Sequence, residues 1–503
     1  MPAPASELRR PGLWLAGLSG LAFSLRAIGI GANSLWFDEA VSYLAARLPL
    51  ADLLTNAAQS SHPPLYYLIL KAWLAVAPEG DGWLRAPSLL FGVLLVPAVY
   101  ALGLGLFGQE RLGLTAAGLV AISPFHILYA HELRMYTLLM LLVTAGAYAY
   151  WRALGAGGRW WAAAGLLWLA AAYSHLFAWL CLAGLGLHAL WRGRRAVTLR
   201  VGLMIALIAL LFSPWALGLL AEPESELGSL RPLAQAAERN PLKPLSGLAF
   251  LLFGMSARRG YTGLALFLSL GLLIILPLEA RKAWRAAGKP AGGPLALGLI
   301  MVGLVVGLPA SLYLAKPYFL PERSLAAAAP FLAVLLAWGV GRRASPLPWL
   351  ALASAGLMAV GAALYLSGPA VKPPYRDALA LVAELARPDD VVLHTSDGSY
   401  LPALRYLPER PGLLLAGDPD PRKPDSVYVL LGGQRWGVEQ AAGHPGRLWL
   451  VVALEHSLEW QQAQLAVLDA RRQRLEEHNV GGIQIILYAG RNPEAVGLAG
   501  RAG

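Results

Sequence analysis

Two adjacent carboxylates, Asp38 and Glu39, follow the first strongly apolar stretch of the chain, within the segment Ser34-Leu-Trp-Phe-Asp-Glu-Ala40. An ionised side chain at the centre of a membrane-spanning helix costs at least about 2.5–3.5 kcal/mol, so acids beside such stretches often mark a working site. A carboxylate can remove a proton from a hydroxyl group or bind a cation. A solvated pair on an external loop is the alternative interpretation.

A second polar group follows in the segment Ser61-His-Pro-Pro-Leu-Tyr-Tyr67. Two consecutive prolines fix a turn and end any helix that precedes them. His62 is therefore held at a defined turn just before a pair of tyrosines, and we predict that His62 and Tyr66 contact substrate. The alternative is a proline turn with tyrosines at the membrane interface.

A third group, His131-Glu-Leu-Arg-Met-Tyr136, lies at a membrane boundary. On a helix, Glu132 and Tyr136 would share one face and His131 and Arg134 another. We predict that all four side chains contribute to a binding site. A local ion pair between Glu132 and Arg134 is the alternative.

Further candidate ligands for an anion lie later in the chain. His175 falls at an outer turn, within Tyr173-Ser-His175, and is either a site residue or an ordinary interfacial histidine. Lys316 and Arg323 flank a segment rich in aromatic residues and proline. Arg323 offers a planar fork suited to phosphate, whereas Lys316 could equally extend to ordinary lipid phosphates.

The composition indicates a membrane protein. Of 503 residues, 57% are hydrophobic and 14% are charged, against about 25% charged in soluble proteins. The single cysteine, Cys181, excludes an intramolecular disulfide and a cysteine-based metal site. The net charge of +11 does not indicate nucleic acid, because the positive residues lie in short loops between apolar runs.

We predict an all-α polytopic membrane region of about eleven spans, because many apolar runs approach the roughly 20 helical residues that cross a bilayer. Lys and Arg are enriched on the loops that share a side with the N-terminus, so we place the N-terminus in the cytoplasm and the C-terminus outside the plasma membrane. Residues 242–255 look re-entrant or interfacial. The predicted spans are about 11–31, 84–107, 112–129, 135–152, 160–174, 176–191, 200–219, 261–278, 294–314, 324–340 and 347–366.

From residue 369 onward the chain changes character, so we divide it into a transmembrane region, 1–368, and an extracytoplasmic α/β domain, 369–503. Short β-rich segments alternating with helical patterns predict a largely parallel sheet. The glycine spacing of a dinucleotide site is absent, so we assign no cofactor there. The expected strands are 390–395, 412–416, 426–431, 448–454 and 483–488, and the expected helices are 375–387 and 458–477.

External acids, a histidine-rich rim and outward cations above a bundle of spans suit transfer of a group from a membrane-anchored phosphate donor. The chain has no nucleotide-phosphate loop, so a soluble nucleotide donor is not supported.

The chain resembles the bacterial branch of the GT-C membrane glycosyltransferases, near the protein O-mannosyltransferases and aminoarabinose transferases of glycosyltransferase family 39. The resemblance covers roughly residues 10–340. It rests on the ordered segments Trp36-Phe-Asp-Glu-Ala40, His62-Pro-Pro-Leu-Tyr66, Arg85-Ala-Pro-Ser88, Ser123-Pro-Phe125, His131-Glu-Leu-Arg-Met-Tyr136, Tyr173-Ser-His175 and Pro321-Glu-Arg323.

The resemblance implies transfer of a sugar from a polyprenyl-phosphate carrier to an extracytoplasmic protein, lipid or glycan acceptor, usually with inversion. Asp38 takes the position of an aspartate that acts as general base or lies beside the acceptor, and Glu132 that of a second acid near the donor or a metal. Asp38 and Glu132 are therefore candidate ligands for a divalent cation. Some relatives have Lys where this chain has His62, which leaves the donor sugar open.

The candidate roles follow from these positions. Glu39 would shape the site beside Asp38, while His62 and Tyr136 would position the sugar. The donor phosphate would be held by Arg85, Arg134 and Arg323. Two other classes stay open: a transporter or flippase of lipid-linked sugars, and a scaffold protein that binds through residues 369–503.

Overall fold

The structure is a computed structural model with two compact units. It describes residues 10–59, 62–221, 240–254, 259–315, 322–342, 344–368, 372–410, 412–415, 435–453 and 458–490. The first unit comprises Met1–Ile30, Leu50–Pro78 and Trp83–Gly368, and the second comprises Gly31–Pro49, Glu79–Gly82 and Pro369–Gly503. The division expected from the sequence assigns Gly31–Pro49 to the membrane region, whereas its contacts place it in the second unit.

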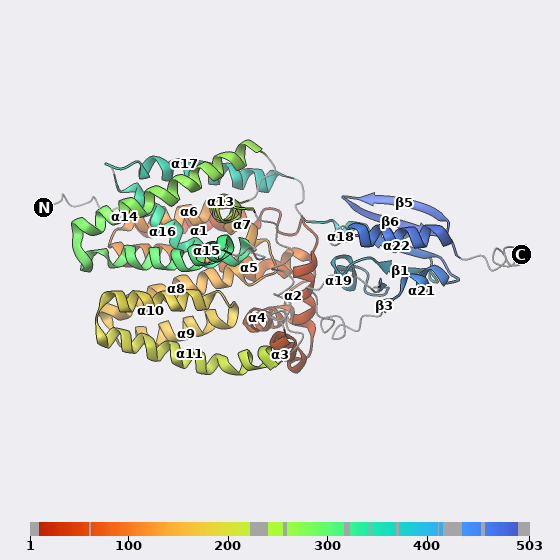
Figure 1. Cartoon of the computed structure of the whole chain (residues 1–503), viewed down its shortest axis with the longest axis horizontal. Helices are drawn as coiled ribbons and strands as arrows, with labels where there is room; N and C mark the ends of the chain where they lie inside the picture. The colour runs from red at the N-terminus through yellow and green to blue at the C-terminus, as the bar shows by residue number, and fades with distance from the viewer. Residues whose placement is uncertain are drawn as a thin grey trace, which may run out of the picture. The chain divides into compact units, whose positions relative to one another are not determined.

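Helices build the first unit, and α8 to α11 run side by side in it (Figure 1). The long apolar helices leave many large hydrophobic side chains exposed, as lipid-facing surfaces require. The elements are α1 (Pro11–Ala27), α3 (Leu50–Gln59), α4 (Leu65–Leu74), α5 (Asp81–Phe107), α6 (Glu110–Ile122), α7 (Pro124–Ala130), α8 (Tyr136–Ala156), α9 (Arg159–Ser174), α10 (Ala178–Arg192), α11 (Arg195–Ala221), α13 (Lys243–Phe253), α14 (Arg259–Val302), η1 (Gly303–Gly307), α15 (Leu308–Ala315), η2 (Glu322–Ala328), α16 (Ala329–Val340) and α17 (Leu347–Ser367).

Within the described residues, six helices are long and apolar enough to cross a membrane, and α6 with α7 makes a seventh if the pair, bent by 57°, is one span. The chain is thus a multi-pass membrane protein. The other predicted spans correspond to shorter helices: α1, α9, α10 and α16 have 17, 16, 15 and 12 residues. The count of eleven and the orientation of the termini stay predictions. The six are Asp81–Phe107, Tyr136–Ala156, Arg195–Leu220, Gly260–Ala286, Gly293–Ala315 and Leu347–Ser367.

The break between α6 and α7 is stabilised by a buried arginine from α1. Pro124 has no N–H, so the Val120 carbonyl four residues earlier lacks its helical donor. The Arg26 guanidinium donates to that carbonyl at 2.9 Å and to the Ala121 carbonyl at 3.0 Å. Burial of this cation is tolerated because it satisfies backbone groups that the proline leaves open.

The second unit contains α2 (Phe37–Arg47) and a six-stranded mixed sheet of order β3-β2-β1-β4-β6-β5. The strands β3, β2, β1 and β4 run parallel to one another. β6 pairs antiparallel with β4, and β5 pairs antiparallel with β6. The remaining elements are α18 (Tyr375–Leu385), β1 (Val391–His394), α19 (Asp397–Tyr406), β2 (Leu413–Leu415), β3 (Arg435–Trp436), α21 (Val438–Gly443), β4 (Leu448–Val452), α22 (Leu458–Arg471), β5 (Arg474–Val480) and β6 (Ile483–Tyr488).

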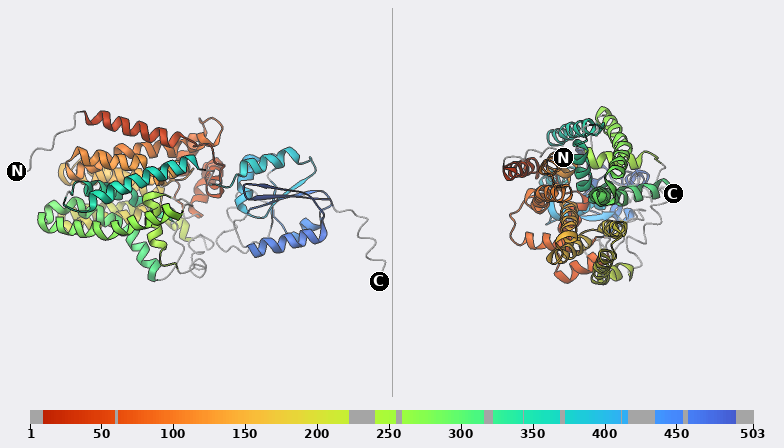
Figure 2. Two further views of the ribbon diagram at one scale, coloured as in Figure 1. Left: turned by 90° about the horizontal axis from the view of Figure 1, so that it is seen from above. Right: turned by 90° about the vertical axis from the view of Figure 1, so that its left-hand side faces the viewer.

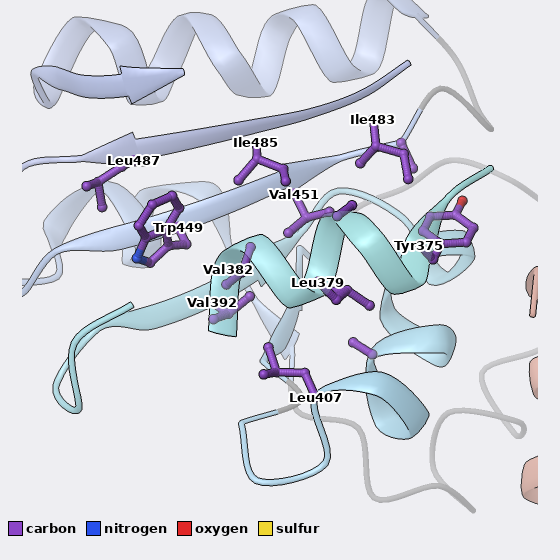
Figure 3. Packing of buried hydrophobic residues seen from close by; sticks show 13 residues of the cluster. Tyr375, Leu379, Val382, Val392, Leu407, Trp449, Val451, Ile483, Ile485 and Leu487 are labelled. Atoms are coloured by element: carbon purple, nitrogen blue, oxygen red, sulfur yellow. The ribbon is translucent and has the colours of Figure 1, made fainter. Parts of the chain in front are cut away.

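Helices cover both faces of this sheet, as the left view of Figure 2 shows. Successive strand residues point to opposite faces, so Trp449 and Val451 of β4 pack under α18 and α19, whereas Leu448 and Leu450 pack against α21 and α22. Figure 3 shows the first of these cores, with the α18 side chains lying against the strands.

One predicted helix is partly wrong. The expected helix over residues 458–477 ends at Arg471, and Arg474–Val480 forms β5 instead. Gly481 and Gly482 have φ values of 56° and 93°, so they form a tight turn that connects β5 to the antiparallel strand β6. Pairing with β6 thereby overrides the local helical preference. The expected strand at 426–431 lies outside the described residues.

A buried carboxylate holds the start of β1. Asp390 accepts hydrogen bonds from Arg447 Nε and Trp449 Nε1, at 2.8 and 2.9 Å, and from the Arg387 backbone N–H at 2.9 Å. Burial alone would raise the pKa of this carboxyl, but these hydrogen bonds lower it to about 2.

Replacing Asp390 with Asn is expected to lower the free energy of opening of β1 and β4 by about 2 kcal/mol at pH 7. Because the folded-state pKa lies below the ordinary value of 3.8, this contribution is complete above about pH 4 and is lost as the pH falls through about 2. Native-state hydrogen exchange of the two strands measures it. The exposed neighbour Asp389 gives a matched control, and an equal effect of Asp389→Asn would contradict the assignment.

Candidate functional site

The predicted carboxylate pair lies in the first turn of α2. Trp36, the N-cap residue, has extended backbone, and the helix begins at Phe37, which puts Asp38 and Glu39 at the end where the helix dipole favours negative charge. Asp38 is 8% exposed and Glu39 is fully buried. The alternative interpretation, in which the two carboxylates are a solvated pair on a loop, therefore does not hold in this structure.

An apolar face fixes α2 within the second unit. Ala40 is completely buried in a cluster with Tyr400, Leu401 and Leu414, which come from α19 and β2. Figure 1 shows α2 beside α19. The carboxylate helix, which the sequence connects to the membrane spans, therefore packs as a part of the C-terminal α/β unit.

A buried ion pair joins Glu39 to the segment that follows the last span. Lys372 Nζ lies 2.9 Å from Glu39 Oε2, and the two side chains are 8% and 0% exposed. The Lys372 backbone N–H also donates to Asn33 Oδ1 at 3.3 Å. Sequence analysis missed Lys372 because its segment has only the signature of a proline-rich linker.

A second set of polar contacts holds the same region. Arg376 donates to the backbone carbonyls of Gly31 and Ala32, at 3.3 and 3.1 Å, and to Asp81 Oδ2 at 3.3 Å. Tyr406 donates its hydroxyl to Asp81 at 2.6 Å and accepts the Leu35 N–H at 2.7 Å. These contacts tie residues 31–35 and Asp81 to α18 and α19.

In the first unit, four predicted residues form what we call the His–Arg cluster: His62, Arg134, His175 and Arg323. Arg134 donates through Nη2 to His62 Nε2 at 2.8 Å, and the His62 and His175 ring centroids are 6.3 Å apart. These four residues, which the sequence analysis proposed as site residues, come from four separate segments of the chain.

Both imidazoles of the cluster are neutral. Desolvation lowers the pKa of His62 well below its usual range, and the charges of Arg134, His175 and Arg323 lower it further. Desolvation, with Arg134 and Arg323, lowers the pKa of His175 to about 3. His62 therefore accepts a hydrogen bond from the Arg134 guanidinium. This bond holds the arginine side chain in place without neutralising its positive charge.

Aromatic side chains line this cluster. Tyr136 is 1% exposed and its ring lies 5.8 Å from that of His175 and 4.8 Å from that of Tyr129. Beside Arg323, Glu322 pairs with Lys243 of α13, which fixes the start of η2. A cationic group with an aromatic wall is suited to a phosphate that carries a sugar.

Two predicted residues, Tyr66 and Arg85, make hydrogen bonds that support the backbone of the first unit. Tyr66 is fully buried and shares a 2.8 Å hydrogen bond with Ser88, which donates to the Arg134 carbonyl at 3.2 Å. Arg85 donates to the Ile30 carbonyl at 2.8 Å. The sequence analysis did not name Ser88 as a site residue, although Ser88 ends Arg85-Ala-Pro-Ser88, one of the segments on which the family resemblance rests.

His131 bridges two helices. Its Nε2 is 2.8 Å from the Arg26 carbonyl, which only accepts, so Nε2 carries the proton, and Nδ1 accepts the Tyr365 hydroxyl at 3.1 Å. Both ring nitrogens are thereby engaged, which favours a structural role.

The remaining candidates differ in what can be said of them. Glu132 is 7% exposed, within the turn between α7 and α8. Lys316 lies outside the described residues. Within the part of the chain that the structure describes, no group of three or more His, Cys, Asp or Glu residues could hold a metal ion. Asp38 and Glu132 belong to different units.

Comparisons with known proteins give a family match for part of the chain. A family model described as dolichyl-phosphate-mannose-protein mannosyltransferase matches residues 61–217, which contain His62, Arg134 and His175. No curated protein sequence matches the chain.

Solved structures share the fold over almost the whole chain. ArnT from Cupriavidus metallidurans in the apo state aligns with a TM-score of 0.64 and 13% identity, covering 96% of this chain and 100% of that one. The same protein bound to undecaprenyl phosphate gives 0.61 and 12%, over 96% and 99%. Archaeal oligosaccharyltransferase AglB from Archaeoglobus fulgidus, in complex with an inhibitory peptide and a dolichol-phosphate, gives 0.51 and 14%, over 96% and 75%.

The match over residues 61–217 and the shared fold indicate a glycosyltransferase, because both point to membrane proteins of the GT-C class. In residues 61–217 the chain is similar to the dolichyl-phosphate-mannose-protein mannosyltransferases.

Proposed function

We propose that this protein transfers a sugar from a polyprenyl-phosphate-linked donor to a hydroxyl group of an extracytoplasmic acceptor, with Asp38 as the general base. The observation that carries the proposal is the His–Arg cluster, in which Arg134 is held by a neutral imidazole and keeps its positive charge. ArnT, whose fold this chain shares, has been solved with undecaprenyl phosphate bound, which supports a polyprenyl-phosphate donor.

The donor phosphate would bind to the fork of Arg134 and to Arg323, because guanidinium groups pair with phosphate oxygens through parallel hydrogen bonds. Tyr136 and His62 would position the sugar. The membrane-facing helices of the same unit would accommodate the isoprenoid tail, which is as apolar as the lipid around it.

The transfer step balances without a general acid. Asp38 takes the proton of the acceptor hydroxyl, and the acceptor oxygen forms a bond to the anomeric carbon of the sugar. The bond between that carbon and the phosphate oxygen breaks, and polyprenyl phosphate leaves with one additional negative charge. Arg134 and Arg323 stabilise that charge as it develops. A single displacement of this kind inverts the anomeric centre.

The proposal places the site on the outer side of the plasma membrane, with the N-terminus in the cytoplasm, because Lys and Arg are enriched on the loops of the N-terminal side. The acceptor is a protein, a lipid or a glycan with a free hydroxyl group. AglB has been solved with a bound peptide, which makes a protein the first acceptor to test.

A panel of undecaprenyl-phosphate-linked sugars tests the proposal. The purified protein in lipid nanodiscs is incubated with each donor and with cell-envelope extract, and mass spectrometry follows the release of undecaprenyl phosphate and the new glycoconjugate. We expect release that depends on the extract and a matching glycan that is lost in a deletion strain. Movement of a donor across vesicle membranes with no glycosylated product would instead establish the flippase alternative.

A further inference from the structure

We infer that the C-terminal α/β unit positions the catalytic carboxylate, and that the buried Lys372–Glu39 ion pair is the contact through which it does so. This inference rests on the proposed role of Asp38. It assigns to Lys372 a positioning function, and to the α/β unit a part in catalysis.

The length of α2 is the first argument. The helix has 11 residues, and isolated helices shorter than about 12–15 residues are marginal in water. Its conformation therefore depends on the surface against which it packs. That surface is α19 and β2, through the cluster of Ala40 with Tyr400, Leu401 and Leu414.

The second argument is the position of the ion pair on that helix. Glu39 is the residue next to Asp38, and both lie in the first turn. Because the side chain of Glu39 is fully buried, its charge requires a partner, and Lys372 Nζ at 2.9 Å supplies it. Loss of Lys372 would leave a buried carboxylate without that compensation, in the turn that carries the proposed base.

The third argument is that residues 372–376 form several hydrogen bonds and an ion pair with residues 31–39. Lys372 binds Asn33 through its backbone and Glu39 through its side chain. Arg376 binds Ser34 Oγ through its backbone N–H at 3.1 Å, and its guanidinium binds the carbonyls of Gly31 and Ala32. A segment that serves only as a linker has no need of such contacts.

The test compares Lys372→Met with the unchanged full-length protein in nanodiscs. Hydrogen exchange of the amides of residues 37–47 is expected to rise by on the order of 10- to 100-fold, because the first turn of α2 loses its anchor. With the undecaprenyl-phosphate sugar that the unchanged protein turns over, kcat is expected to fall about 10-fold or more, while KM for that donor changes by less than about 3-fold.

Two further variants separate this role from a general loss of folding. Arg471 forms an exposed ion pair with Glu439 in the same unit, so Arg471→Met should leave exchange at residues 37–47 unchanged. The double variant Lys372→Met with Glu39→Leu removes both buried charges, and we expect it to restore most of the protection of α2. If the amides of residues 37–47 exchange as fast in the double variant as in Lys372→Met, the unpaired buried charge is not the cause of the lost protection, and the role of the ion pair is overturned.

The remaining outcomes are distinct. Unchanged exchange in Lys372→Met overturns the inference. Faster exchange with unchanged kcat, in a protein that Asp38→Asn inactivates, overturns the positioning role. If Asp38→Asn is fully active, the general-base part of the proposed function fails, and the exchange data still report whether Lys372 docks α2.

Discussion

Replacing Asp38 with Asn is expected to lower the rate of sugar transfer by roughly 10²–10⁴-fold, the usual contribution of a general base. Asparagine keeps the size of the side chain and its capacity to accept one hydrogen bond, but it cannot take a proton at neutral pH. The packing of α2 should therefore persist while the chemistry is lost. The released undecaprenyl phosphate measures the rate, with the donor saturating.

Asp52 provides the matched control, because it is an exposed carboxylate on α3, in the same loop between α1 and α5. Asp52→Asn should transfer sugar at the rate of the unchanged protein. Hydrogen exchange of residues 37–47 in Asp38→Asn should also match that of the unchanged protein, which shows that the helix remains docked. Full activity of Asp38→Asn would refute the general-base assignment.

Replacing Arg134 with Gln is expected to lower kcat by roughly 10²–10³-fold and to weaken the binding of undecaprenyl phosphate. The size of the effect follows from the loss of a preorganised charge at the leaving group. Arg134→Lys keeps a positive charge but loses the planar fork and its fixed hydrogen bond to His62, so we expect intermediate values. Single-turnover rates and a direct binding titration with undecaprenyl phosphate separate the two effects.

The exposed Arg200 of α11 gives the control for Arg134, since Arg200→Gln removes the same charge from the same unit. It should change neither rate nor affinity. If Arg134→Gln binds undecaprenyl phosphate as tightly as the unchanged protein and keeps its kcat, the His–Arg cluster is not the donor site. The phosphate would then have to be held by other cations.

The four residues of the His–Arg cluster could be named from the sequence because each stands at the end of an apolar or proline-marked segment. His62 stands next to two prolines that fix its turn, and His175 is the C-cap residue of α9. Polar side chains at the ends of apolar helices lie near a membrane surface, because the bilayer excludes them from its centre. The sequence alone therefore predicted these residues as candidates, but it did not predict the hydrogen bond between Arg134 and His62.

The hydrogen bonds of two other predicted residues required the structure. The Tyr66 hydroxyl shares a hydrogen bond with Ser88, whose hydroxyl donates to the Arg134 backbone carbonyl. The His131 ring joins the Arg26 carbonyl to the Tyr365 hydroxyl. Such contacts depend on the direction of a side chain, which residue spacing does not give.

By itself the sequence determined that this is a helical membrane protein with a strand-containing C-terminal region, because apolar length and periodicity are local properties of the chain. It also determined which acids and cations stand at the ends of apolar segments. Only the tertiary structure decided that the carboxylate helix belongs to the C-terminal unit. Glu39 and Lys372 are 333 residues apart, and burial of a charge is favourable only once folding brings its partner to it.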